Sequence, residues 1–292
     1  MVAGVGEILW DVIGDAERLG GAPVNFAYYV NSLGATGIPV STIGDDDRGW
    51  HALEVLSQKG LSTDAVSLDL AHPTGYVMAN VDDQGVAHYR FPDETAWDYL
   101  HINGFARSIA DKLSAVCFGT LAQRSTMAKR SIREFIHWIP DKTLVVYDMN
   151  LRQDFYNRRL MEESLILCNV LKLNDAELQV VAQMFGISNK ECEALSVLVE
   201  KFSLQLAIVT KGKNGSLMIS PKNKAEHPGY PTKVIDTIGA GDAFTAAATL
   251  GLLQNHDLAD ISEYANRFAA HVCSHKGAMP MISMDMKIDQ GN

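Results

Sequence analysis

The stretch Asp236-Thr237-Ile238-Gly239-Ala240-Gly241-Asp242-Ala243-Phe244 decides the fold of this chain, and an Ala-rich helical run follows it as far as Leu253. Two glycines flank Ala240, so backbone N–H groups can converge there without obstruction by side chains. The start of a helix adds partial positive charge to such a turn. The stretch therefore predicts a binding site for an anion, with phosphate as the natural candidate.

Asp242 lies beside this predicted anion site, where a carboxylate repels a negatively charged ligand unless it has another task. A general base that takes the proton of a hydroxyl attacking phosphate explains its presence. An aspartate that only stabilises the start of the helix is the alternative. The stretch by itself leaves these two interpretations equally open.

A second glycine-rich stretch, Gly20-Gly21-Ala22-Pro23-Val24-Asn25, also precedes a predicted helix, and Asp11 follows the first predicted strand. Tight glycines let a polyol approach the backbone. Asp11 and Asn25 could accept and donate hydrogen bonds to neighbouring hydroxyls. A plain turn followed by a helix cap explains the same residues, so this stretch alone predicts a sugar site only weakly.

Short apolar or β-branched runs alternate along the chain with longer stretches of helical periodicity. This alternation is typical of an α/β fold, in which helices flank a mostly parallel central sheet. The predicted strands are 2–9, 38–43, 115–118, 143–147, 170–173 and 205–210, and the clearest predicted helices are 25–33, 48–59 and 175–185.

One segment breaks the alternation, because 75–81 and 86–91 read as two strands joined by Asp82-Asp83-Gln84-Gly85. An exposed hairpin needs something to cover or pair its edges, so we interpret it as part of a lid over a pocket. An edge hairpin without that task is the alternative. The predicted lid comprises 11–21 and 73–99, and the predicted nucleotide- and substrate-binding core comprises 1–10, 22–72 and 100–292.

Composition excludes several classes of protein. The chain has 292 residues and a formal net charge of −10, and it lacks a basic stripe, so nucleic acid is not an expected partner. No apolar run approaches the length of a membrane span, and no basic segment precedes an apolar one at the start. Four cysteines without a C-x-x-C spacing are typical of reduced thiols, so we expect a cytoplasmic protein. The sequence motifs of P-loop NTPases and of Rossmann dehydrogenases are missing.

Together the two glycine-rich stretches resemble the signature regions of the PfkB family of carbohydrate kinases, which have the ribokinase-like fold. The second region matches D-T-x-G-A-G-D over 236–242. Between the two regions, 148–152 resembles the D-x-N-x-R stretch of the family, 174–177 its N-x-x-E, and 210–215 its T-x-G-x-x-G. The resemblance covers essentially the whole chain and implies a three-layer fold with a small β lid. The residues that match the first region are Gly20, Gly21, Asn25, Ala27, Gly34 and Gly44.

The resemblance implies an enzyme that transfers the γ-phosphoryl group of ATP to a sugar hydroxyl. In this reading Asp242 is the general base, and the N–H groups of Gly239, Ala240 and Gly241 stabilise the transferred group. Glu177, with Asn174, would hold Mg²⁺ through water, and Arg152 would lie near the sugar or the phosphoryl group. The implied nucleotide-binding residues are Asn174, Thr210, Lys211, Gly212, Gly215 and Asn266. A monovalent cation, potassium above all, would bind carbonyl groups of Asp236, Ile238, Val272, His275 and Gly277.

Within the family the chain looks most similar to fructokinases, so fructose is the expected substrate. Tyr89 and Arg90 resemble residues by which 2-keto-3-deoxygluconate kinases bind a carboxylate, and Arg152 would suit that too, which makes that kinase the main alternative. A ribokinase is a further alternative. A sugar or nucleotide sensor without turnover stays open as another class, although the presence of Asp242 argues against it. Lids in relatives often join two subunits, so a homodimer through the lid is also expected.

Overall fold

The computed structural model describes residues 1–14, 16–81, 87–283 and 286. The strands of its main sheet are β1 (Val2–Val5), β4 (Gly37–Gly44), β5 (Val66–Asp69), β8 (Ala115–Phe118), β9 (Leu144–Asp148), β10 (Val170–Asn174), β11 (Leu206–Thr210), β12 (Ser216–Ile219) and β13 (Lys224–His227). A second, small sheet contains β2 (Leu9–Ile13), β3 (Ala16–Gly20), β6 (Gly75–Val81) and β7 (Ala87–Arg90). The helices are α1 (Ala22–Ser32), α2 (Asp47–Gln58), α3 (Gly104–Ile109), α4 (Thr126–Trp138), α5 (Arg158–Leu167), α6 (Asp175–Phe185), α7 (Glu191–Phe202), α8 (Ala240–Leu253) and α9 (Leu258–Cys273). The short 3₁₀ helices are η1 (Ala96–Tyr99), η2 (Ala110–Lys112), η3 (Leu121–Arg124) and η4 (Gly212–Asn214).

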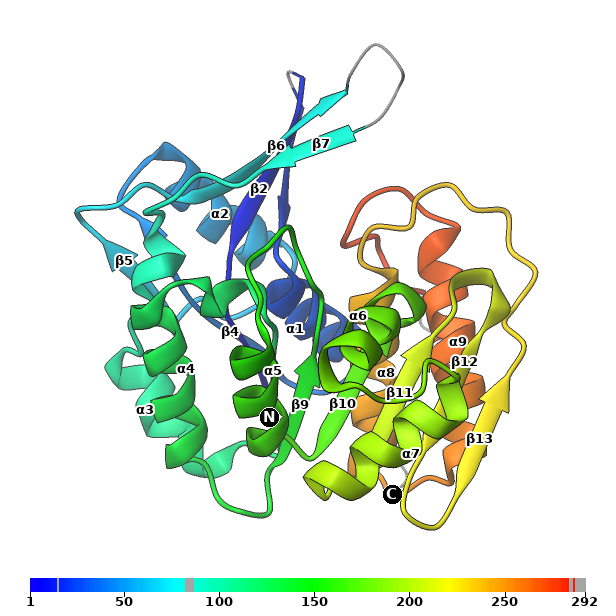
Figure 1. Ribbon diagram of the computed structural model, residues 1–292. Coiled ribbons are helices and arrows are strands. Elements are labelled where there is room, and N and C mark those ends of the chain that lie inside the picture. The colour runs from blue at the N-terminus through cyan, green and yellow to red at the C-terminus, as the bar shows by residue number, and fades with distance from the viewer. Residues whose placement is uncertain (15, 82–86, 284–285, 287–292) are drawn as a thin grey trace.

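The main sheet has the strand order β13-β12-β11-β10-β9-β8-β1-β4-β5 (Figure 1). Its strands from β11 to β5 run parallel, while β12 and β13 are antiparallel additions at one edge. The small sheet, in the order β3-β2-β6-β7, projects from the main body at the top of Figure 1. The predicted α/β fold with a mostly parallel sheet and a small β lid is confirmed.

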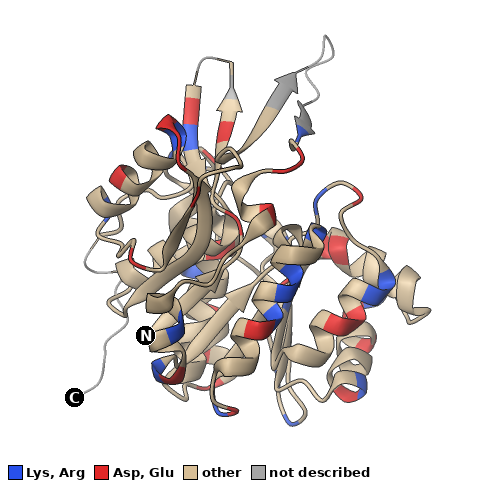
Figure 2. Cartoon of the chain, turned by 90° about the vertical axis from the view of Figure 1, so that its left-hand side faces the viewer, with Lys and Arg blue, Asp and Glu red and all other residues tan. Residues whose placement is uncertain are grey.

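Helices cover both faces of the main sheet. Consecutive residues of a strand point to opposite faces, so each strand contributes to both cores. Val2 lies in the core with α1, α2, α8 and α9, whereas Ala3 lies in the core with α4, α6 and α7. These two apolar cores make the three layers that the family resemblance implies. Figure 2 shows Lys and Arg interspersed with Asp and Glu on the helices that face the viewer.

Helix α6 illustrates how local sequence sets the elements. Asn174 Oδ1 accepts from the N–H of Glu177 at 2.9 Å, and Glu177 Oε2 accepts from the N–H of Asn174 at 2.8 Å. This reciprocal capping box satisfies two N–H groups at the helix start. Gly186, with φ of 66°, ends the helix in the left-handed conformation. The predicted bounds 175–185 are therefore confirmed.

The predicted strand 2–9 is wrong in its second half. Strand β1 ends at Val5, and Leu9 already belongs to β2 of the small sheet. Gly6 adopts φ of 149° at this point, a conformation that other residues rarely take, and the chain turns from one sheet to the other. An apolar run does not reveal such a change of sheet. The predicted hairpin strands appear as β6 and β7, and their turn, 82–85, lies outside the described residues.

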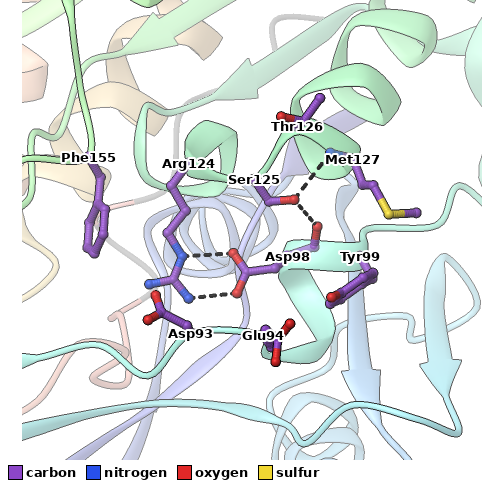
Figure 3. A pocket seen from close by; sticks show the side chains of 9 residues that line it. All are labelled: Asp93, Glu94, Asp98, Tyr99, Arg124, Ser125, Thr126, Met127 and Phe155. Carbon is purple, nitrogen blue, oxygen red and sulfur yellow. Dashed lines mark hydrogen bonds and ion pairs between the residues drawn. The ribbon is translucent and has the colours of Figure 1, made fainter.

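A buried ion pair stands where the small sheet joins the core (Figure 3). Arg124 Nε and Nη2 donate to the two carboxylate oxygens of Asp98 at 2.7 and 2.6 Å. The guanidinium group also lies 4.1 Å from the ring centre of Trp97 and 5.0 Å from that of Phe155. The pair forms part of the wall of a pocket of about 320 Å³. It ties the segment after β7 to the segment before α4.

We expect the Asp98→Ala variant to lose about 3–5 kcal/mol of its free energy of unfolding, because it leaves the Arg124 charge buried and unpaired. Urea denaturation checks this. The control is Glu134→Ala, which breaks the exposed pair of Arg130 and Glu134 and should cost at most about 0.5 kcal/mol. Equal losses in the two variants would contradict the assigned role of the buried pair.

Candidate active site

The turn before α8 has the shape that the sequence predicts for an anion site. Gly239 has φ of 79°, and a Cβ added to it would lie 2.5 Å from the carbonyl oxygen of Ala278. The hydroxyl of the buried Tyr29 donates to that same carbonyl at 2.7 Å. The turn therefore packs against Tyr29 of α1 and against Ala278 near the C-terminus. The first N–H groups of α8 have no partner within the helix and carry the positive end of its dipole.

Asp242 stands in the first turn of α8, and its Oδ2 accepts a hydrogen bond from Asn25 Nδ2 of α1 at 2.8 Å. Burial, with the nearby charge of Asp148, raises the pKa of Asp242 to about 7. A carboxyl group with such a pKa is a much stronger base than an exposed aspartate, yet it is still ionised above neutral pH. The position and the pKa both suit proton abstraction from a hydroxyl group.

Lys172 brings a buried positive charge to the same place, and the sequence analysis missed it. Its Nζ lies 3.0 Å from Asp148 Oδ1, and Asp148 Oδ2 accepts from the hydroxyl of Thr245 in α8 at 2.7 Å. A Cβ added to Gly241 would lie 3.1 Å from this Nζ. Burial opposes the charge, but Asp148 and the other carboxylates nearby outweigh it and raise the pKa of Lys172. A lysine inside an apolar strand was the available signal.

The glycine turn predicted for the sugar leads into α1, whose Asn25 contacts Asp242. A Cβ on Gly20 would lie 2.8 Å from Asp11 Oδ2, and one on Gly21 would lie 2.4 Å from the carbonyl oxygen of Glu7. Burial raises the pKa of Asp11, and the charge of Arg152 acts against this rise at both Asp11 and Asp242. Arg152 therefore lies within electrostatic reach of both carboxyl groups.

The two substrate residues predicted on the hairpin, Tyr89 and Arg90, belong to β7. Arg90 is exposed at the end of β7. The side chain of Tyr89 lies outside the part of the chain that the structure describes. Their predicted roles toward a carboxylate stay predictions.

A pocket of about 840 Å³ opens beside the turn of α8. The predicted nucleotide residues in its wall are Thr210, Gly212, Gly215 and Asn266, together with Ala240 and Gly241 of the turn. Lys211 differs, since it is absent from this wall and its Nζ pairs with Glu226 at 3.1 Å and with Glu191 at 3.3 Å. Asn174, also predicted for the nucleotide, is likewise absent from this wall, and its side chain caps α6.

Glu177 lies in the first turn of α6 and contacts the segment that carries Arg152. Its Oε1 accepts from the N–H of Leu151 at 2.8 Å, and its Oε2 takes part in the capping box with Asn174. Each oxygen keeps a second lone pair, which can accept from a water molecule. The described residues hold no group of three or more His, Cys, Asp or Glu for a metal ion. This donor set fits Mg²⁺ bound mainly by phosphate and water.

The predicted carbonyl site for a monovalent cation is drawn together by Asp236. Its Oδ2 accepts from the N–H of Gly277 at 2.9 Å, and its Oδ1 accepts from that of Ile238 at 3.1 Å. The carbonyl of Val272 accepts from the N–H of His275 at 3.0 Å at the end of α9. The segments 236–238 and 272–277 therefore lie side by side, and carbonyl oxygens are the ligand type that such a cation needs.

Comparison with known proteins decides the family. Residues 9–284 match the profile described as pfkB family carbohydrate kinase. The chain belongs to this family. This PfkB chain is therefore a carbohydrate kinase, and the site described above lies within the matched residues.

Individual relatives of this PfkB kinase are distant in sequence. It is 27% identical over 297 residues to an uncharacterized sugar kinase, PH1459, from Pyrococcus horikoshii, which covers 95% of this chain and 91% of the relative. It is 26% identical over 276 residues to the fructokinase of Salmonella typhimurium, covering 86% of this chain and 84% of that one.

Solved structures of the family have the same fold. The crystal structure of PH1459 in complex with ATP has a TM-score of 0.81 and 25% identity, and the match covers 96% of this chain and 94% of that chain. A double mutant of the fructokinase of Vibrio cholerae, solved with fructose, ADP and a potassium ion, has a TM-score of 0.80 and 22% identity. That match covers 98% of this chain and 94% of the other. No helix among the described residues of this PfkB kinase is long and apolar enough to span a membrane.

We expect kcat/KM of this PfkB kinase for its sugar to rise between about pH 6 and pH 8, with a midpoint about 7. The ionised form of Asp242 is the one that can take a proton, and burial moves its titration upward from the usual acidic range. Initial rates of ADP release across this range check the prediction, with coupling enzymes in excess at every pH. A flat profile below pH 7 would show that no buried base of this kind limits the reaction.

Proposed function

We propose that this chain transfers the γ-phosphoryl group of ATP to a hydroxyl group of fructose. The observation that carries the phosphoryl-transfer part is the half-buried Asp242, held by Asn25 directly beside the turn at the start of α8. A base and an anion site within one helical turn suit an attacking hydroxyl and a phosphoryl group. The ATP named with PH1459 and the fructose and ADP named with the fructokinase support the choice of ligands.

In the proposed reaction, Asp242 takes the proton of the sugar hydroxyl as its oxygen attacks the γ-phosphorus atom. A new O–P bond forms, and the bond between the γ-phosphorus and the oxygen that leaves with ADP breaks. The N–H groups of Gly239, Ala240 and Gly241 stabilise the charge on the transferred group, and Lys172 adds positive charge from behind the turn. Catalysis then consists of positioning and electrostatic stabilisation.

The remaining predicted residues serve the nucleotide and its ions in this proposal. Thr210, Gly212 and Gly215 line the nucleotide pocket, and Glu177 with Asn174 would hold Mg²⁺ through water. Bound Mg²⁺ neutralises charge on the triphosphate. The carbonyl groups gathered around Asp236 would hold potassium. A lid function for the small sheet, its pairing of two copies, and the boundaries of lid and core stay predictions.

Charge at the site supports a neutral sugar over a sugar acid. Glu7, Asp11 and Asp242 present three carboxyl groups on this side of the site. An anionic substrate would meet repulsion from these groups, whereas hydroxyl groups can donate to them. The fructokinase names of relatives such as the Salmonella protein agree with this choice.

Asp242→Asn should lower kcat by about 10²–10⁴-fold, because the amide cannot take the proton of the attacking hydroxyl. Steady-state rates with Mg-ATP and fructose measure this, and calorimetry should give an unchanged Kd for ATP. Asp257→Asn, at an exposed position before α9, is the matched control and should leave kcat unaltered. An Asp242→Asn protein with the wild-type rate would contradict the proposed mechanism.

Among fructose, ribose, tagatose, adenosine and 2-keto-3-deoxygluconate, we expect fructose to be phosphorylated with the highest kcat/KM. ADP release with Mg-ATP and potassium measures each one. Preferred turnover of 2-keto-3-deoxygluconate would keep the role of Asp242 and overturn the argument from charge, moving attention to Arg90 and Arg152. No turnover on any compound would overturn the kinase proposal in favour of a binding protein, which calorimetry would then detect.

A further inference from the structure

Glu7 is a buried carboxyl group without a full set of partners. Its side chain is 2% exposed, and its Oε1 accepts only a long hydrogen bond, 3.3 Å, from the N–H of Ala22. Its Oε2 has no hydrogen-bond partner among the described residues. Burial raises the pKa of Glu7 to about 7, and the backbone N–H groups of Glu7 and Ala22, with the charges of Arg152 and Arg124, only partly oppose that rise.

Such a group is costly to keep, since a buried polar atom without a partner loses its hydration and gains nothing in return. Asp98 shows how this chain otherwise treats a buried carboxylate: Arg124 and the backbone of Thr95 satisfy its oxygens. Proteins tolerate departures from this rule chiefly at functional sites. The contrast between the two carboxyl groups indicates that Glu7 meets its partner when a ligand binds.

Glu7 lies at the sugar side of the site. It follows β1, at the carboxyl edge of the parallel strands, where ligands of α/β proteins bind. Gly21 presses against its carbonyl oxygen, and the N–H of Ala22 reaches its side chain. One helical turn further along α1, Asn25 binds the proposed base Asp242.

Asn25 carries a second acceptor of the same kind. Its Nδ2 is used by Asp242, but its Oδ1 is buried and has no partner among the described residues. Two unsatisfied acceptors therefore flank the first turn of α1, and Glu7 and Asp11 lie on either side of the Gly20–Gly21 turn. Neighbouring hydroxyl groups of a sugar supply the O–H donors that these acceptors lack.

We propose that Glu7 is a specificity-determining residue of the sugar site, whose Oε2 accepts a hydrogen bond from a sugar hydroxyl other than the one that is phosphorylated. This inference rests on the proposed function and deepens it. It makes the ligand a neutral polyol with a hydroxyl donor close to the reacting one. A sugar that lacks this donor leaves Oε2 buried without a partner and is therefore discriminated against.

The test compares wild type with Glu7→Met, which keeps the length of the side chain and removes both oxygens. The substrates are fructose, or the sugar that wild type phosphorylates best, and its set of monodeoxy analogues. We expect Glu7→Met to lower kcat/KM for the parent sugar by about 10- to 100-fold. For one analogue, the one that lacks the bound hydroxyl, wild type and variant should agree within about threefold. Glu7→Gln, which keeps an acceptor oxygen, should recover part of the loss.

Thermal unfolding separates this role from a structural one. Glu7→Met should unfold at the same temperature as wild type or at a higher one, because it removes an unpaired buried carboxyl group. Asp98→Asn is the matched control, a buried carboxylate with all its partners, and should unfold at a lower temperature. A Glu7→Met protein that is destabilised like the control and loses kcat/KM equally on every analogue would overturn the proposal.

The same experiment distinguishes the two proposals. If the wild-type protein phosphorylates none of the sugars, no variant needs to be compared. That outcome overturns the proposed function, and the role of Glu7 with it. Wild type that is active, with the same ratio of wild-type to Glu7→Met rates on the parent sugar and all analogues, overturns the role of Glu7 alone.

Discussion

The position of a carboxylate beside an anion-binding turn is the constraint on which the rest of this structure depends. Asp242 and the N–H groups of Gly239 to Gly241 belong to one helical turn, so a carboxylate lies beside the positive end of the α8 dipole. Asn25 holds the carboxylate from α1, while Lys172 and Asp148 of the central strands form a buried ion pair beside it. One helical layer, with α1 and α8, meets the central sheet at this point.

Burial sets the chemistry of the site as much as the identity of its residues does. Burial raises the pKa of Glu7 to about 7, and partial burial together with the charge of Asp148 raises the pKa of Asp242 to about 7. The paired carboxylates of the chain show the opposite arrangement, as at Glu163, where Arg159 and Arg133 lower the pKa to about 2. Among the described residues, Glu163 thus has two arginine partners, whereas Oε2 of Glu7 has no hydrogen-bond partner.

The small sheet contributes to the site from outside the main sheet. Strand β2 carries Asp11, and strand β3 carries Gly20. Arg18 Nη1 of β3 lies 3.7 Å from Asp236 Oδ2, in the segment 236–238. The buried pair of Arg124 and Asp98 ties the segment that follows β7 to the segment before α4. Substrate groups on the small sheet are in this way positioned relative to Asp242, although the two belong to distant parts of the chain.

The sequence by itself determined the α/β class, the bounds of α6 and β8, the two glycine turns and the identity of Asp242, because caps, turns and alternation are properties of neighbouring residues. Tertiary structure alone decided that β1 ends at Val5, that Lys172 stands behind Gly241, and that Lys211 is absent from the wall of the nucleotide pocket. It also decided that Glu7 is buried without a full set of partners. These features depend on contacts between residues far apart in the chain and on the loss of water around them, and neither leaves a periodic or local pattern in the sequence.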